Sequence, residues 1–248
     1  MNIIKFLIRK ITNYFLNKKY IVKDKNKNNI FSIRLLGGNT LGRAETFYTK
    51  EPDTVKWIEN FHSKSTFFDI GANIGIYSLY AAKLNHSVVA FEPESLNFAA
   101  LNVNISDNNF VNKIKAYPIS VDEKSFISDL NISQLRFGGS FAVYDTGIIE
   151  NTKVIKKHTQ GSFSLSLDDF IEKTKIVPDY IKIDVPSNEL RVVKGLEKTI
   201  REKKIKSLLI EFDECLKEHE DMILNLEKVG YKVRNFNPKS NHYILYLN

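Results

Sequence analysis

Apolar runs and amphipathic segments alternate along most of the chain, and this pattern predicts strands that alternate with helices. Short runs that are apolar throughout are typical of strands buried on both faces, whereas apolar residues spaced three and four positions apart indicate a helix. Strands are predicted at residues 66–71, 87–93, 113–120, 180–185 and 207–212, of which 113–120 is the weakest and the last two should be central. Helices are predicted at residues 53–61, 76–84, 96–103, 190–200 and 216–229, the last ending before Gly230. Residues 231–236 and 242–247 are expected to close the chain as a hairpin of strands.

This order of elements favours an α/β fold, with a mostly parallel sheet covered by helices on both faces and a terminal antiparallel hairpin. The main domain should span residues 51–248, after a basic extension at residues 1–50 that contains a helix and a short strand at 30–36. The polar stretch at about 122–161 interrupts the alternation. We interpret it as an insertion at the carboxyl ends of the strands, where open α/β sheets bind ligands.

The formal net charge is +7, and much of the excess lies in the first 27 residues. Six apolar side chains fall near helical spacing there, at Ile4, Leu7, Ile8, Ile11, Tyr14 and Phe15. This segment is expected either to pack on the domain or to contact an anionic membrane surface. It is too short and too interrupted for a secretory signal.

No platform of basic residues interleaved with aromatics is present in the sequence, so a nucleic-acid partner is not expected. The single cysteine, Cys215, rules out a disulfide within the chain and indicates a reducing compartment. The expected location is therefore the cytoplasm, at the inner face of the membrane if the N-terminal helix binds it.

The stretch FFDIGANIGIYSLYAA combines a strand, a glycine loop and a helix, the unit that cradles a nucleotide-like cofactor. Its glycine loop reads G-x-N-x-G at Gly71, Asn73 and Gly75, and Asn73 puts a polar side chain where a dinucleotide needs close approach of the backbone to phosphate. No G-K-[ST] motif is present either. Glu92 ends the next strand, where it can accept hydrogen bonds from both ribose hydroxyls. Together these features favour S-adenosylmethionine over a dinucleotide.

Several segments, in chain order, resemble the FkbM family of class I methyltransferases. They are FFDIGANIGIYSLYAA, VVAFEPESLNFAALNVN, SLDDFI, PDYIKIDV, NELRVVKG and IKSLLIEF. The resemblance implies the Rossmann-like, seven-stranded methyltransferase sheet and an enzyme that transfers a methyl group from S-adenosylmethionine to oxygen. Acceptors in this family are commonly hydroxyls of sugars in polysaccharides and glycoconjugates, or of polyketide-type products.

The resemblance also implies the residues that bind the cofactor. Asp69, Gly71, Asn73 and Gly75 would line its amino-acid end, Glu92 its ribose and Ser120 its adenine.

One departure from the family concerns the segment after the fourth strand. The family pattern K-I-D-V-E-G-x-E reads KIDVPSNE here, so Pro186 and Ser187 replace a Glu-Gly pair. An altered acceptor is the expected consequence. The alternative is a cofactor-binding but catalytically silent subunit of a glycan-biosynthesis pathway.

Charged residues near the strand ends supply the candidate catalytic groups. Lys182 and Asp184 should share one face of their strand, and Glu211 should lie on the same face of the next strand. A buried charge is costly unless it is paired, so Lys182 is expected to pair with these carboxylates. Asp184 is predicted to accept the proton of the acceptor hydroxyl or to orient that hydroxyl, with Glu189 or Glu211 in support.

His158, in the insertion, is the alternative base. No metal site is predicted, because the sequence has no His/Cys ligand cluster and lacks the Asp-Asn pair that metal-dependent catechol methylation uses after the fifth strand.

Overall fold

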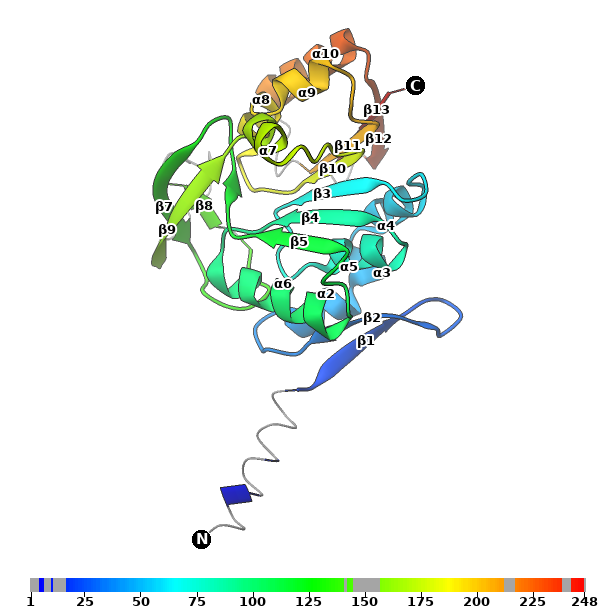
Figure 1. Ribbon diagram of the computed structural model, residues 1–248, viewed down its shortest axis with the longest axis vertical. Helices are drawn as coiled ribbons and strands as arrows, with labels where there is room; N and C mark the ends of the chain where they lie inside the picture. Colours follow the sequence, from blue (N-terminus) through cyan, green and yellow to red (C-terminus); the bar gives the residue numbers. More distant parts are fainter. Residues whose placement is uncertain are drawn as a thin grey trace.

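A seven-stranded sheet forms the centre of the computed structural model, which describes residues 5–6, 10, 17–140, 142–144, 157–211, 217–237 and 242–247 (Figure 1). The strand order is β12-β13-β11-β10-β3-β4-β5. The strands span β3 Thr66–Ile70, β4 Ser87–Phe91, β5 Ile114–Tyr117, β10 Tyr180–Ile183, β11 Ser207–Glu211, β12 Lys232–Asn237 and β13 His242–Tyr246. Neighbours from β5 to β11 pair in parallel, and β13 pairs antiparallel with both β11 and β12. The predicted Rossmann-like fold with a terminal hairpin is confirmed.

Helices cover both faces of this sheet because successive side chains of each strand point to opposite sides. The bounds are α4 Pro52–Glu59, α5 Ile76–Lys83 and α6 Ser95–Asp107 for one face, and α7 Leu167–Thr174, α8 Glu189–Lys194, α9 Glu197–Arg201 and α10 Lys217–Val229 for the other. Phe67 of β3 packs in the core below α4, α5 and α6, whereas its neighbour Phe68 packs in the core below α7 to α10. Two separate apolar cores therefore hold the sheet rigid between them.

The prediction of one continuous helix at 190–200 is wrong, because the structure has two helices there, α8 and α9. The division falls at Gly195, where a Cβ atom would lie 2.2 Å from the backbone oxygen of Asp122. Close approach of the insertion to this point therefore requires glycine. The predicted end of α10 is confirmed, since Gly230 follows Val229 with a φ of +112°.

The N-terminal extension packs on the helical layer that contains α5 and α6 (Figure 1). It contains β1 Lys19–Lys23, β2 Asn29–Arg34, α2 Thr40–Glu45 and α3 Phe47–Lys50. The strand predicted at 30–36 corresponds to β2, whereas β1, its antiparallel partner, was missed among the lysines. Asn104 of α6 and Asn108, the residue after its end, accept hydrogen bonds at 2.7–2.8 Å from the backbone of β2. From Lys19 onward, the extension thus shares the core of the main domain.

The amphipathic helix predicted near the N-terminus falls almost entirely outside the described residues, as does Cys215. The contact with an anionic membrane therefore stays a prediction. In the part of the chain that the structure describes, no helix is both long and apolar enough to cross a membrane.

A second, four-stranded sheet lies near the carboxyl ends of β4 and β5 (Figure 1). Its strands are β6 Ser120–Val121, β7 Phe126–Ile132, β8 Ala142–Tyr144 and β9 His158–Leu165, in the order β6-β9-β7-β8. This sheet occupies the stretch that the sequence indicates as an insertion. It supplies one wall of the cleft described below.

Candidate functional site

The glycine loop joins β3 to α5 at the point where the strand order of the sheet reverses, between β4 and β10. Gly71 has a φ of +80°, and a Cβ atom there would lie 2.0 Å from the backbone oxygen of Asp184. Gly75 has a φ of +86° and packs against Leu101 of α6. Asn73 also has a positive φ, 53°, a conformation that asparagine tolerates better than most residues. The loop therefore lies closely packed between the end of β10 and the middle of α6.

The side chain of Asn73 binds the insertion. Its Nδ2 donates a hydrogen bond to the backbone oxygen of Gly139 at 2.6 Å. Asn97 of α6 donates to the same oxygen at 3.1 Å and accepts a hydrogen bond from the backbone N–H of Gly138 at 2.8 Å. Asn73 thus holds residues 137–139, here called the 137–139 segment, against the loop. This contact gives the central asparagine a role that no phosphate-binding glycine could fulfil.

Glu92 lies one residue beyond the end of β4, and only 6% of it is exposed. Its carboxylate accepts hydrogen bonds from the backbone N–H groups of Asn73 at 2.7 Å and Glu94 at 2.9 Å. Burial raises the pKa of Glu92 to about 7, although the two hydrogen bonds lower it. An ionised carboxylate has about four lone-pair sites, so acceptor capacity remains for a ligand hydroxyl.

These residues surround a cleft at the carboxyl ends of the strands, with a volume of about 190 Å³. The glycine loop, the ends of β4 and β10, the insertion, α2 and α8 all contribute to its lining. Its lining residues are Arg43, Gly71, Asn73, Glu92, Pro93, Ser120, Leu130, Gly139, Ser140, Ala142, Asp184, Val185, Pro186, Ser187, Asn188 and Arg191. Pockets for drug-sized ligands span roughly 300–1,000 Å³, so the volume between the described residues is smaller than that of a typical ligand pocket.

Four of the six predicted cofactor residues line this cleft: Gly71, Asn73, Glu92 and Ser120. Asp69 and Gly75 lie behind it. Asp69 is 1% exposed and accepts a hydrogen bond from the hydroxyl of Ser78 at 2.6 Å. Burial raises the pKa of Asp69. Asp69 of β3 is therefore hydrogen-bonded to α5, and this contact links the two elements that the glycine loop joins.

A cluster of charged groups lies next to the cleft. The ammonium of Lys182, 1% exposed, is 2.6 Å from the carboxylate of Asp184. Carboxyl oxygens of Glu51, Asp184 and Glu211 all lie within 4.8 Å of one another, a spacing that could hold a metal ion. Burial alone would lower the pKa of Lys182, but the surrounding carboxylates, Asp184 first, outweigh it and raise that pKa. Lys182 therefore provides a positive charge within the cluster.

Glu51 and Tyr77 complete this cluster, and neither was predicted. Glu51 precedes α4 and is buried; burial opposes its ionisation, but Lys182 and Lys50 outweigh burial and lower its pKa to about 2. The ring of Tyr77, on α5, lies 5.2 Å from the ammonium of Lys182. Burial raises the pKa of Tyr77 well above its usual value, so its hydroxyl stays protonated. Glu51 lies outside the segments that resemble the family, and Tyr77 lies within FFDIGANIGIYSLYAA at a helix position that the sequence analysis did not single out.

The structure separates the other two predicted catalytic candidates from the cleft. Glu189 is buried as the first residue of α8 and does not line the cleft. His158 is exposed at the start of β9 and does not line it either. Asp184 is thus the predicted catalytic residue with direct access to a ligand, and its side chain is 33% exposed.

Two arginines that were not predicted from the sequence also line the cleft. They are Arg43 of α2 and Arg191 of α8. Arg191 pairs with Asp122, with its Nη2 at 2.6 Å from the carboxylate. Arg43 donates from Nε to the backbone oxygen of Gly138 at 2.8 Å. The helix α2 was not predicted from the sequence, and the predicted helix that contains Arg191 gave no sign of a ligand contact.

Pro186 and Ser187 form a tight turn at the edge of the cleft. The N–H of Asn188 donates to the oxygen of Val185 at 3.1 Å, and Ser187 has a φ of +59°. These features define a type II turn, in which proline suits the second position and glycine the third. Proline therefore preserves the turn, while serine occupies the position that favours glycine.

Replacing Ser187 with Gly is expected to stabilise the protein by about 1 kcal/mol, because a left-handed conformation costs a non-glycine residue about that much. Urea unfolding measures the change. Lys175→Gly is the matched control, since Lys175 has a φ of +61° at the end of α7, and should gain a similar amount. Destabilisation by Ser187→Gly alone would show that the serine side chain makes a contact of its own.

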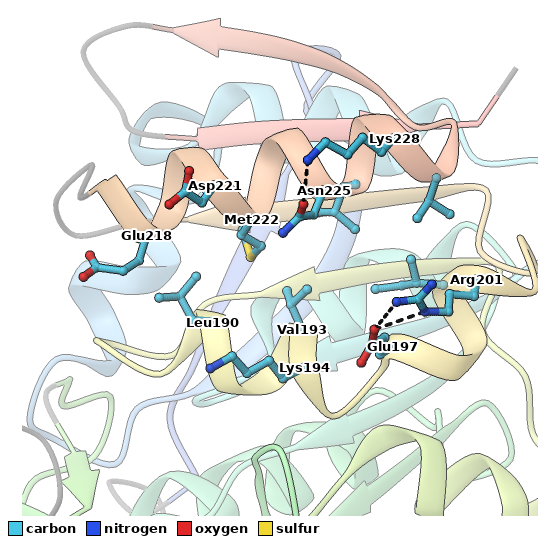
Figure 2. Close-up of a pocket in the computed structure, with 13 residues that line it drawn as sticks. Leu190, Val193, Lys194, Glu197, Arg201, Glu218, Asp221, Met222, Asn225 and Lys228 are labelled. Atoms are coloured by element: carbon cyan, nitrogen blue, oxygen red, sulfur yellow. Dashed lines mark hydrogen bonds and ion pairs between the residues drawn. The ribbon is translucent and has the colours of Figure 1, made fainter.

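A larger cavity, of about 600 Å³, lies between α8, α9 and α10 (Figure 2). Leu190 and Val193 of α8 face Met222 of α10 across it, and charged side chains surround the opening. Glu197 and Arg201 at that opening pair with each other at 2.5 Å while remaining more than 60% exposed. No predicted site residue lines this cavity, so the cleft at the strand ends is the candidate site.

The sheet order, the glycine loop and the acidic residue after β4 together define a class I methyltransferase. The family model described as Methyltransferase FkbM domain matches residues 69–233, and the chain belongs to this family. This fold implies S-adenosylmethionine as the methyl donor.

Solved structures of methyltransferases are similar in fold. A methyltransferase FkbM from Methylobacillus flagellatus has a TM-score of 0.50 and 18% identity, over 84% of this chain and 53% of that chain. The present chain thus spans about half the length of that protein. The human methyltransferase 10 domain containing protein has a TM-score of 0.46 and 16% identity, over 79% of this chain and 80% of that chain. Precorrin-6y C5,15-methyltransferase from Geobacter metallireducens has a TM-score of 0.46 and 10% identity, over 80% of this chain and 87% of that chain. A comparison with curated proteins found no match.

Replacing Glu92 with Ala is expected to weaken binding of S-adenosylhomocysteine by about 1.5–3 kcal/mol, the usual contribution of hydrogen bonds to a charged group. Isothermal titration calorimetry measures this loss. Glu94→Ala is the comparison, because Glu94 caps α6 through the N–H groups of Leu96 and Asn97 and does not line the cleft. Equal affinities of wild type and Glu92→Ala would contradict a role of Glu92 in binding the ribose.

Proposed function

We propose that the protein is an S-adenosylmethionine-dependent O-methyltransferase that acts on a hydroxyl of a sugar, a glycan or a similar small molecule. The observation that supports this proposal is the position of Asp184. Its carboxylate follows β10, lines the cleft and is paired with a buried ammonium. Methylation of a hydroxyl requires a group that orients it and accepts its proton, and a carboxylate at this position fits that role.

The surroundings of Asp184 favour proton acceptance. Burial raises the pKa of Asp184, and the carboxylates of Glu211 and Glu51 add to this effect, so that Lys182 does not reverse it. A general base is most effective when its pKa approaches the working pH. Lys182 holds the carboxylate in place at 2.6 Å, which leaves its second oxygen for the acceptor hydroxyl.

The remaining residues that line the cleft fit a binding site for the methyl donor. S-adenosylmethionine, when bound, supplies a methyl group on a positively charged sulfur. Gly71, Asn73, Glu92 and Ser120 are the residues that would hold it. The absence of a side chain at Gly71 lets the loop pack closely on the end of β10, next to Asp184, and Glu92 offers acceptors for hydroxyl groups.

A methyl-transfer assay tests the proposal. The protein is incubated with methyl-labelled S-adenosylmethionine and, separately, with free sugars, nucleotide sugars and extracted cell-envelope glycan. Label should enter at least one hydroxylated acceptor as a base-stable methyl ether, with wild type but not with Asp184→Asn. Base-labile label would instead indicate methylation of a carboxylate. Intact binding of S-adenosylhomocysteine with no transfer to any acceptor would support a catalytically silent subunit.

A further inference from the structure

Arg43 projects from α2 into the cleft, and its guanidinium has no carboxylate of the described residues within ion-pair distance. Its Nε donates to the backbone oxygen of Gly138 at 2.8 Å. Among the described residues, no carboxylate oxygen lies within ion-pair distance of its guanidinium. Because Nε is occupied, the four N–H groups on the two terminal nitrogens remain for another partner.

Arg191, the second arginine of the cleft, provides a contrast. Its Nε lies 3.0 Å from both carboxylate oxygens of Asp122, and its Nη1 lies 3.5 Å from Glu123. These two acids compensate its charge within the protein. In the described lining, Arg43 is therefore the arginine without a carboxylate at ion-pair distance, and its charge interacts only at longer range with that of Glu92.

Arg43 is also held in a fixed position next to the glycine loop. The N–H of Asn39, just before α2, donates to the oxygen of Phe137 at 2.8 Å, so the 137–139 segment contacts α2 at two points. The same segment contacts Asn73 through the oxygen of Gly139. One short segment thus connects Arg43 to the centre of the glycine loop. A guanidinium anchored in this way loses little freedom when it binds a ligand.

We infer that Arg43 binds the carboxylate of the amino-acid part of S-adenosylmethionine. The other charged groups in the lining are the acids Glu92 and Asp184, which repel a carboxylate, and the compensated Arg191. The planar fork of a guanidinium matches the two oxygens of a carboxylate, and such charge-assisted pairs are the strong ones. This inference rests on the donor that the fold implies and adds a residue from the N-terminal extension to its site.

Two ligands and two variants test the inference by calorimetry. The ligands are S-adenosylhomocysteine and its decarboxylated analogue, which keeps the adenosine, the sulfur and the amine. Arg43→Gln retains an N–H donor for Gly138 and removes the charge; it should weaken binding of S-adenosylhomocysteine by about 10- to 100-fold. The same variant should change binding of the analogue by less than about twofold. Arg136→Gln is the control for general charge, because Arg136 is exposed and does not line the cleft, and it should affect neither ligand.

Each other outcome overturns the inference in a distinguishable way. An equal loss for both ligands would show that Arg43 acts by holding the 137–139 segment. No loss for either ligand would show that the carboxylate binds elsewhere. Failure of the wild-type protein to bind S-adenosylhomocysteine would instead overturn the assignment of S-adenosylmethionine as the methyl donor. Circular dichroism melting of each variant separates these outcomes from misfolding.

Discussion

Asp184→Asn is expected to lower turnover by about 10²- to 10⁴-fold, the usual contribution of general acid–base catalysis. Asparagine keeps the shape of the side chain and can still accept a hydrogen bond from Lys182, but it cannot take a proton. Because Asp184 would act on the acceptor, the affinity for S-adenosylhomocysteine should change little. Steady-state kinetics and calorimetry on the same preparation measure the two quantities.

His158→Asn is the matched comparison, since it removes the alternative base, which does not line the cleft, and it should leave turnover near normal. If Asp184 only neutralised Lys182, Asp184→Asn would lower the melting temperature and leave turnover almost unchanged. A loss of turnover with His158→Asn but not with Asp184→Asn would indicate that the general base is His158 of the insertion.

Gly71→Ala is expected to destabilise the protein by about 3–5 kcal/mol, at the upper end of single-residue effects. The added Cβ would lie 2.0 Å from the backbone oxygen of Asp184, and backbone cannot turn aside as a flexible side chain can. The φ of +80° adds about 1–2 kcal/mol of strain for alanine. Urea unfolding measures the loss.

Two other glycines serve as controls for Gly71→Ala. At Gly75 the added Cβ meets the end of the Leu101 side chain at 2.3 Å, which can move, so a smaller loss is expected. At Gly161 nothing lies within 4 Å and φ is not positive, so alanine should cost little. A stability of Gly71→Ala equal to that of Gly161→Ala would contradict the close packing of the loop on β10.

Much of the fold could be predicted from the sequence because buried parallel strands are apolar throughout. They are therefore easily distinguished from amphipathic helices. The register of β10 between β3 and β11 then places Lys182 beside Asp69 and Leu209. The strand β1 escaped prediction because its lysines face solvent and Val22 is its one buried residue. Likewise, the division between α8 and α9 depends on contact with Asp122, about 70 residues away in the chain, which no local pattern reports.

The candidate site was predictable only where a motif carries it. Gly71, Asn73, Glu92 and Asp184 stand at strand ends or in the loop, positions that the order of elements defines. Arg43 and Glu51 reach the site from segments that carry no motif. Tyr77 and Asn97 lie within segments that resemble the family, but at helix positions whose spacing does not report a role in the site. Their contribution depends on tertiary packing, such as the contact of the 137–139 segment with α2 and α6.

The burial of Glu92 has a consequence for proton balance. With a pKa of about 7, a large share of Glu92 carries a proton at neutral pH, and only the ionised form can accept both ribose hydrogen bonds. Between the usual pKa of glutamate and 7, the folded chain holds more protons than the unfolded chain, so this group makes the free protein less stable as pH rises. Cofactor binding should therefore expel a proton into the buffer and strengthen as pH rises through 7. Binding enthalpies measured in phosphate and in Tris, which differ in ionisation enthalpy, should diverge for the wild type and coincide for Glu92→Gln.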